Sequence, residues 1–171
     1  TQLFLDRGFD QVTVAEVARE AGVSSVTVFK HFPRKEDLLL DRTDDAVDLL
    51  RVAARNHADV LSSLRETALR LVDERHALSG LADGSVPFFR TVAASPALIA
   101  RTREIAAELQ HTLEKELPGD ATLLAAFFIA GYTRVLVETA RRLIADEPAD
   151  TVADDHRARL EKLFDALRHG V

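Results

Sequence analysis

Basic side chains that could bind a polyanion gather in one short stretch near the start of this chain. Lys30, Arg34 and Lys35 lie there, and no acidic residue occurs from Ala21 through Lys35. In the whole chain, acidic residues outnumber basic ones by 28 to 22, and the net charge is −6. The net charge therefore excludes a protein that coats nucleic acid generally, and any contact with a polyanion has to be local.

Residue types used in catalysis or metal binding form no recognisable arrangement. The chain has no Cys, which excludes disulfide bonds, thiol nucleophiles and thiolate metal sites. The six His residues show no spacing of four between them, and no phosphate-binding glycine loop or G-x-S-x-G motif occurs. Asp154, Asp155 and His156 are adjacent, but a solvated helix start explains them better than a metal site. We predict a protein that is not an enzyme and has neither a cofactor nor a metal.

Local signals between residues 12 and 35 predict two short helices joined by a sharp turn, which would position the basic stretch. Thr13 and Glu16 have the spacing of a capping box, which marks the start of a helix over about 13–21. Gly22 can adopt the left-handed conformation that ends this helix without a steric penalty.

The second helix is expected over about 24–31, from the N-cap Ser24 to the break at Pro33. Its core-facing side combines Ser24 with Val28, His31 and Phe32. The other side mixes hydroxyl, apolar and basic side chains: Ser25, Val26, Thr27, Phe29 and Lys30. Exposed apolar groups beside a lysine suit a helix in the major groove, where Lys reaches guanine or phosphate and Val meets a thymine methyl group. The pattern predicts a helix-turn-helix DNA-binding unit.

The run from Leu3 to Leu39 resembles the N-terminal domain of the tetracycline-repressor (TetR) family of bacterial regulators. The matching positions are a Gly-aromatic step, a capped helix, an A-G-V-S turn and an aromatic-x-His-Phe segment before a lysine: Gly8, Phe9, Thr13, Ala21, Gly22, Val23, Ser24, Phe29, His31, Phe32 and Lys35. Phe29 stands where the family usually has Tyr, so the hydroxyl that would contact a phosphate is lost. Val26 stands where a smaller residue is common, which should alter the base preference.

The resemblance and the helix pattern together predict the residues that contact DNA. They are Thr13, Ser24, Ser25, Val26, Thr27, Phe29, Lys30, His31 and Lys35. We expect Lys35 to hold a phosphate and Thr13 to offer a hydroxyl or a backbone N–H group to another.

Helical patterns without a competing strand pattern continue through the rest of the chain, so we predict an all-α fold of about nine helices. Their expected ranges are about 1–7, 13–21, 24–31, 34–56, 60–76, 87–94, 96–117, 121–145 and 150–168. A helix-turn-helix domain over 1–36, with the start of its first helix missing, would precede a helical effector-binding and dimerisation domain over 37–171. The helix that begins near Arg34 would act as a lever between them.

The resemblance implies a small-molecule site and a homodimer interface in the second domain. Aromatic side chains with three polar anchors are the candidates for an effector pocket: Phe88, Phe89, Phe127, Phe128, Tyr132, Arg101, His111 and Glu138. An ordinary core explains the aromatic residues as well, and a surface position explains the polar ones. The helices over 121–145 and 150–168 have more apolar surface than one core needs, and they predict the dimer interface: Ala130, Gly131, Leu160, Leu163, Phe164 and Leu167.

We therefore expect a cytoplasmic, homodimeric transcriptional regulator that binds double-stranded DNA. The resemblance, rather than any residue, suggests a repressor that a small-molecule effector releases from a palindromic operator. The alternatives are a helical dimeric ligand-binding module and a protein-interaction module, in either of which the helix-turn-helix no longer binds DNA.

The beginning of the chain and its apolar runs bear on completeness and on membrane association. The chain has no Met and opens within a helical pattern, so we expect that residues precede Thr1. No signal peptide is visible, and the longest apolar run, from Leu123 to Gly131, is too short to span a membrane.

Overall fold

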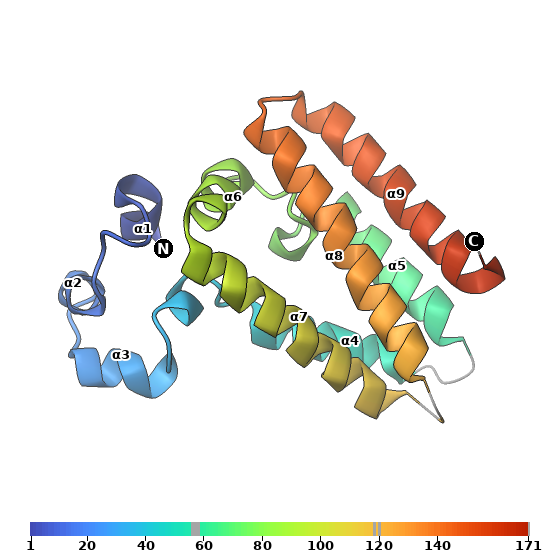
Figure 1. Ribbon diagram of the computed structural model, residues 1–171, viewed down its shortest axis with the longest axis horizontal. Coiled ribbons are helices and arrows are strands. Elements are labelled where there is room, and N and C mark those ends of the chain that lie inside the picture. Colours follow the sequence, from blue (N-terminus) through green and yellow to red (C-terminus); the bar gives the residue numbers. More distant parts are fainter. Residues whose placement is uncertain (56–58, 118, 120, 171) are drawn as a thin grey trace.

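The computed structural model describes residues 1–55, 59–117, 119 and 121–170. Within these ranges the chain forms nine α-helices and two short 3-10 helices, and it has no β-strand. Figure 1 shows a small unit of three helices at one end and a larger bundle of long helices at the other. The predicted all-α fold is confirmed.

Three short helices form the N-terminal unit: α1 (Gln2–Arg7), α2 (Val14–Glu20) and α3 (Ser25–His31). Their bounds agree with the expected ranges to within one or two residues, because caps at Thr13 and Ser24 fix the starts. The three helices surround a small apolar core.

The predicted lever helix from near Arg34 to Asn56 is wrong in its first part. A 3-10 turn, η1 (Glu36–Leu38), is followed by non-helical chain, and α4 begins only at Thr43 and ends at Ala54. The helix is interrupted after Leu38, and the Leu39 side chain is buried in the core of the N-terminal unit. Asn56 lies outside the described residues.

The larger bundle contains α4 and five further helices, which agree with the predicted positions: α5 (Val60–Asp73), α6 (Ser85–Ala94), α7 (Pro96–Glu116), α8 (Thr122–Ile144) and α9 (Ala149–His169). A second 3-10 turn, η2 (Ala77–Ser79), precedes α6. The core of the bundle is made by large apolar side chains of several helices, among them Leu64, Leu113, Phe128, Leu160 and Phe164. In Figure 1, α8 runs alongside α9 and approaches α7 toward the end of α7.

The corner between α6 and α7 closes the core of the N-terminal unit. Leu98 of α7 has no exposed surface and shares one apolar cluster with Phe4 and Phe9. Ser95 directly precedes α7, but its hydroxyl does not cap the helix and instead donates a hydrogen bond to Asp10 Oδ1 at 2.8 Å. The position of the N-terminal unit therefore depends on how α6 and α7 pack.

Candidate nucleic-acid interface

The start of α2 is fixed by a complete capping box. The Glu16 backbone N–H donates to Thr13 Oγ1 at 3.2 Å, and the Thr13 backbone N–H donates to Glu16 Oε2 at 2.8 Å. Arg7 adds an ion pair to Glu16 Oε1 at 2.9 Å. Hydrogen bonds from the Thr13 backbone and hydroxyl, and then from Arg7, lower the pKa of Glu16 to about 2. Thr13 is thus bound within the protein, and its contact with a phosphate stays a prediction.

The turn between α2 and α3 depends on one left-handed glycine. Gly22 has a φ angle of 67°, a conformation that side chains with a Cβ atom rarely adopt. The N–H group of the next residue, Val23, returns to the carbonyl of Ala18 at 2.9 Å and closes the end of α2. This tight closure sets the angle at which α3 leaves α2.

Ser24 starts α3 and its hydroxyl accepts a hydrogen bond from the Thr27 backbone N–H at 3.1 Å. Val28 on the inner side is buried and Phe32 is half-buried, as predicted. His31 differs from the prediction, since its side chain is exposed rather than directed at the core.

The outward face of α3 is apolar and basic and is open to a partner. Val26 is 80% exposed and Phe29 is 49% exposed, and Lys30 is exposed beside them. Exposed apolar side chains that lie together in a patch mark interaction sites more often than single ones do. The flanking Thr27 is exposed and Ser25 is half-buried.

Lys35 has a partner that the sequence did not indicate. Its ammonium group donates a hydrogen bond to the Phe9 carbonyl at 2.7 Å and lies 4.2 Å from the centre of the Phe9 ring. This part-buried contact links the start of η1 to the loop after α1. The predicted phosphate contact of Lys35 stays a prediction, and the ammonium would have to leave Phe9 in order to make it.

Arg34 and Arg101 belong to a charged cluster between the N-terminal unit and α7. Arg101 Nε is 2.9 Å from Asp37 Oδ1, and its Nη1 is 2.6 Å from Glu108 Oε1 and 3.3 Å from Glu104 Oε2. Hydrogen bonds with Glu108 and then Asp37 raise the pKa of Arg101. Arg34 pairs with the same Glu104 oxygen. Arg101 thus lies in an ion-pair cluster and not among pocket-lining residues.

The aromatic candidates for an effector pocket belong to different packing clusters in the described part of the chain. Phe88 packs against the core of the N-terminal unit, while Phe89 lies close to Gly80. Phe128 is in the core of the bundle, next to Tyr132, whose pKa is raised to about 12 by burial. Phe127 is 60% exposed on the outside of α8.

The other two polar candidates differ in exposure: His111 lies on the surface, while the Glu138 side chain is only 12% exposed. His111 is exposed and its Nδ1 is 3.6 Å from Glu114 Oε2. Glu138 pairs with Arg141 at 2.6 Å, and this bond lowers the pKa of the Glu138 carboxyl group. Packing thus distributes the candidates between two apolar cores and more exposed positions, and their grouping around one effector stays a prediction.

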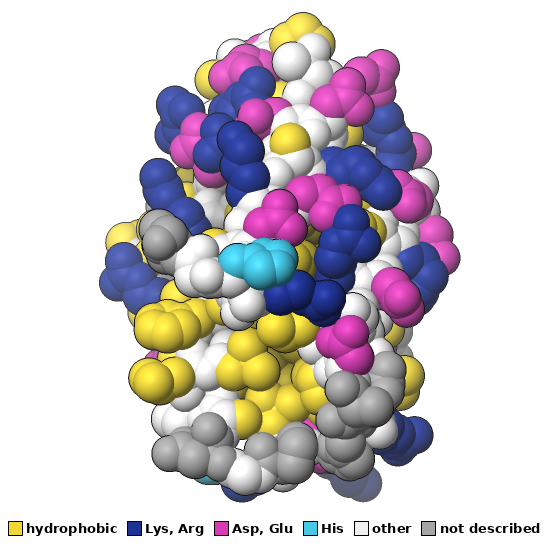
Figure 2. Space-filling view, turned by 90° about the vertical axis from the view of Figure 1, so that its right-hand side faces the viewer, with side chains coloured by type: hydrophobic (Ala, Val, Ile, Leu, Met, Phe, Trp, Pro, Cys, Tyr) yellow, Lys and Arg dark blue, Asp and Glu magenta, His cyan; other side chains and the backbone are white. Residues whose placement is uncertain are grey.

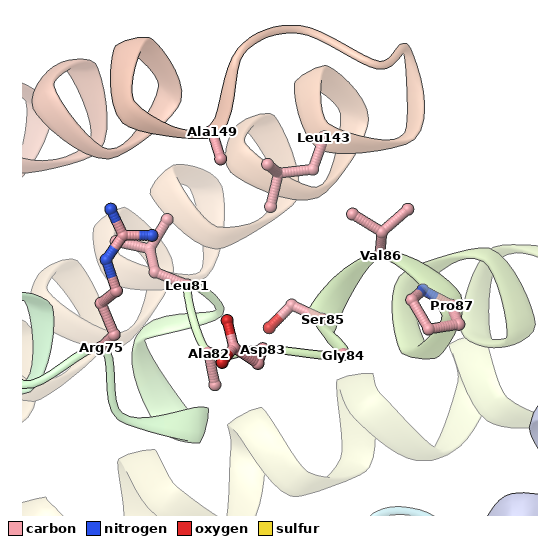
Figure 3. A pocket seen from close by; sticks show the side chains of 10 residues that line it. All are labelled: Arg75, Leu81, Ala82, Asp83, Gly84, Ser85, Val86, Pro87, Leu143 and Ala149. Carbon is pink, nitrogen blue, oxygen red and sulfur yellow. The ribbon is translucent and has the colours of Figure 1, made fainter.

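A small hollow occurs elsewhere, where the start of α6 faces the end of α8 and the start of α9. Its volume is about 190 Å³. Figure 3 shows side chains from all these elements around it: Arg75, Leu81, Ala82, Asp83, Gly84, Ser85, Val86, Pro87, Leu143 and Ala149. None of the predicted pocket residues is among them, and the sequence signal was only the Gly- and Ser-containing segment before α6.

Five of the six predicted interface residues pack against other parts of their own chain. Leu160 and Phe164 are buried in the bundle core, so they are not available to a partner. Leu163 and Leu167 are partly buried against the same core. A Cβ atom on Gly131 would lie 2.3 Å from Leu163 Cδ1, so this glycine lets α8 approach α9 of its own chain. The prediction is wrong for Leu160 and Phe164, and it stays a prediction for the half-buried Gly131.

Among the described residues, the outer face of α8 is another apolar surface that is exposed. Leu123, Phe127 and Val137 are exposed there, and Ala130 lies in the same stripe. Figure 2, which looks at the end of the bundle, shows hydrophobic side chains gathered in its lower half and charged ones above them. The sequence alone does not tell which apolar residues of α8 are exposed and which are buried. That distinction requires knowing which side of α8 faces α9.

By length and composition alone, α8 is the one described helix that could cross a membrane. The run from Leu123 to Gly131, which by itself is too short to span a membrane, is only part of this helix. The observation is weak, because the core helix of a soluble protein passes the same test. Here Ala125, Phe128 and Ile129 of α8 are buried in the bundle core.

Comparisons with known proteins agree with this geometry. Residues 1–41 match the bacterial regulatory proteins of the tetR family. No curated protein matches the chain. A crystal structure from Mesorhizobium loti MAFF303099, of a protein assigned to the TetR-family transcriptional regulators, has a similar fold with a TM-score of 0.53. The two chains are 17% identical, and the similarity covers 95% of this chain and 90% of the other.

Proposed function

We propose that this protein, a tetR-family bacterial regulator by its residues 1–41, is a cytoplasmic homodimeric repressor that leaves its operator when a small molecule binds. Membership of the family implies transcriptional regulation through DNA. Repression, the effector and the cytoplasmic location are the parts that we add. The observation that carries the proposal is the outward face of α3, where Val26 is 80% exposed beside Lys30.

Sequence-specific contacts would come from this face of α3 in the major groove. Lys30 can donate to guanine or to a phosphate, and Val26 and Phe29 can meet thymine methyl groups. Ser24, Ser25, Thr27 and His31 lie around this face, while Thr13 and Lys35 are proposed for phosphates at the rim. Phe29 in place of a tyrosine supports an operator contact that depends more on apolar packing than on a hydroxyl group.

Two copies of the chain would pair through the outer face of α8. Leu123, Phe127 and Ala130 form an exposed apolar stripe that could pack against its own copy about a two-fold axis, and Val137 lies on the same face beyond the exposed Arg134. Two α3 helices would then bind half-sites about 34–36 Å apart. Pairing strengthens binding because the second contact becomes intramolecular.

An effector would act most directly through α6. The hollow of about 190 Å³ is lined by the first residues of α6, and Phe88 and Val92 of the same helix pack against the core of the N-terminal unit. A ligand that shifts α6 would therefore shift the unit that carries α3. We propose this route in place of the predicted lever helix. The predicted boundary between the two domains, at residues 36 and 37, would then be a flexible connection that packs against α6 and α7.

Selection of fragments from the genome of the source bacterium tests the function. The purified protein should retain fragments that share a palindrome, and the Lys30→Ala variant should lose or change this preference. Retention of no fragment by a folded dimer would contradict DNA binding. It would leave the alternative of a ligand-binding or protein-interaction module whose helix-turn-helix is structural.

A further inference from the structure

The basic residue beyond the end of α3, Arg34, has an ion-pair partner on another part of the molecule. Its guanidinium group pairs with the carboxylate of Glu104, which lies on α7. Both side chains are about half exposed, so neither is enclosed by the fold. Arg34 was noted in the basic stretch but was not among the predicted DNA contacts.

The position of Arg34 suits a phosphate contact. The seven residues of α3 span roughly 10 Å, and the major groove is about 12 Å wide. When α3 lies in the groove, its end is therefore close to one of the bordering phosphate backbones. The carbonyl groups at the end of a helix are partly negative, so a phosphate there needs cations beside it.

The neighbouring cations differ in how free they are to move. Lys35 is held against Phe9 by a part-buried hydrogen bond of 2.7 Å. The Arg34 guanidinium is held only by an exposed ion pair, which is weak and can exchange for another anion. Its planar fork also matches two phosphate oxygens.

The carboxylate that holds Arg34 is itself fixed by Arg101. Arg101 Nη1 is 3.3 Å from the Glu104 oxygen with which Arg34 pairs, and Arg101 Nε is 2.9 Å from Asp37 Oδ1. Arg101 is only 12% exposed, so it joins α7 to η1 and keeps Glu104 next to Arg34. The distance between Glu104 and Arg34 therefore follows any shift of α7 against the N-terminal unit.

We propose that Arg34 is a phosphate-binding residue for which Glu104 of α7 competes with DNA. In the free protein the Glu104 carboxylate occupies the guanidinium group, and in the complex a phosphate replaces it. A movement of α7 that brings Glu104 closer lowers DNA affinity, and one that withdraws it raises affinity. This inference rests on the proposed DNA binding and adds a residue and a means of regulation to it.

The first test measures binding to the selected operator and to an unrelated duplex of the same length, at several salt concentrations, by fluorescence anisotropy. Arg34→Gln should weaken both complexes and reduce the slope of log affinity against log salt by about 0.9, the contribution of one phosphate. Arg34→Lys should keep most of the slope. Thermal unfolding verifies that the variants are folded. An unchanged slope in Arg34→Gln would overturn the phosphate contact.

The second test asks whether Glu104 acts through Arg34. Glu104→Gln should raise DNA affinity about two- to fivefold, the range of an exposed ion pair, and should give no such gain when Arg34→Gln is also present. Glu108→Gln is the matched control, because it removes the same charge from the same helix and pairs with Arg101. An equal gain from both Gln variants, or a gain that persists without Arg34, would overturn the competition.

The failure of the function and the failure of the inference give different results. If the wild-type protein binds neither duplex, the proposed function falls and the inference falls with it. If the protein binds its operator and Lys30→Ala changes the preference, while the Arg34 and Glu104 variants behave as wild type, only the inference falls.

Discussion

The hydroxyl of Thr139 on α8 lies 2.7 Å from Nδ1 of His156 on α9, and both side chains are almost completely buried. The other ring nitrogen of His156, Nε2, has no hydrogen-bond partner among the described residues. The ring is therefore kept neutral, since a buried imidazolium would leave a charged donor unpaired. Burial lowers the pKa of His156 to about 4, although the charge of Asp155 acts in the opposite direction.

The pH dependence of stability should follow from this histidine. Between about pH 6.5 and 4 the unfolded chain binds a proton at His156 that the folded chain does not, so the free energy of unfolding falls as the pH falls. The slope is at most about 1.4 kcal/mol per pH unit. Urea unfolding of wild type and His156→Gln from pH 7 to 5 measures it. The slope should be smaller in the variant.

The exposed His111 provides the control for this measurement. His111→Gln should keep the wild-type slope, because its side chain remains in water in both states. The pH range stays above 5 because paired carboxylates with lowered pKa values, such as Glu16 and Asp155, lose their stabilising contribution at more acidic pH. Equal slopes for wild type and His156→Gln would show that the buried ring does not titrate in this way.

Gly131 should be required for the close packing of α8 on α9. An alanine Cβ atom there would lie 2.3 Å from Leu163 Cδ1 and 3.2 Å from its Cγ, so moving one methyl group is not enough. Overpacking of this kind costs about 1–3 kcal/mol, against which alanine gains about 1 kcal/mol of helix propensity. Denaturant unfolding should show that Gly131→Ala stabilises the Leu163→Ala protein and does not stabilise the wild type. The same effect in both backgrounds would contradict the contact.

The dimer should separate when charge is placed on the outer face of α8. Phe127→Glu puts a carboxylate in the middle of the exposed apolar stripe, and sedimentation should show a folded monomer with weak operator binding. Val52→Glu, a change at another exposed apolar residue on α4, should leave the dimer intact. A Phe127→Glu protein that remains a dimer would exclude this face. Leu160 and Phe164 are unsuitable for this test, since changes in the core lower stability by about 2–5 kcal/mol.

Base preference should depend on the outward residues of α3 and stability on the inward one. Val26→Ala and Lys30→Ala should change which sequences are selected from a randomised duplex, by about 1–3 kcal/mol for each lost base contact. Val28→Ala should lower the unfolding temperature and keep the preference of the protein that remains folded, because Val28 is buried. If neither outward change alters selection, α3 is not the helix that reads the sequence.

Helix positions were predictable because their signals are local. Each of these signals acts within a few residues. They are the capping box of Thr13 and Glu16, the glycine at the end of α2, and the Ser95-Pro96 start of α7. The break before α4 was not predictable, since it depends on Leu39 packing in one cluster with Leu98 of a distant helix. Periodicity alone would have continued the helix.

The candidate sites show the same limit of local signals. The face of α3 was predicted, because a seven-residue helix with one buried residue leaves little choice. The apolar stripe of α9 was also predicted, but not its partner. Leu160 packs in the core of its own chain. An apolar stripe in the sequence looks the same whether it packs in its own core or against a second copy of the chain. The aromatic residues of the expected pocket were separated by packing between helices that are remote in sequence.

The burial of Leu98 has a consequence for how this regulator can be recombined. The segment that matches the family ends at residue 41, yet the wholly buried Leu98 that closes its core belongs to α7. A chimera that joins residues 1–41 to the body of another regulator would lack this side chain unless the new body supplies an equivalent one. Exchange of DNA specificity between relatives is therefore expected to succeed by grafting α3 alone, or by moving the segment together with the α6–α7 corner.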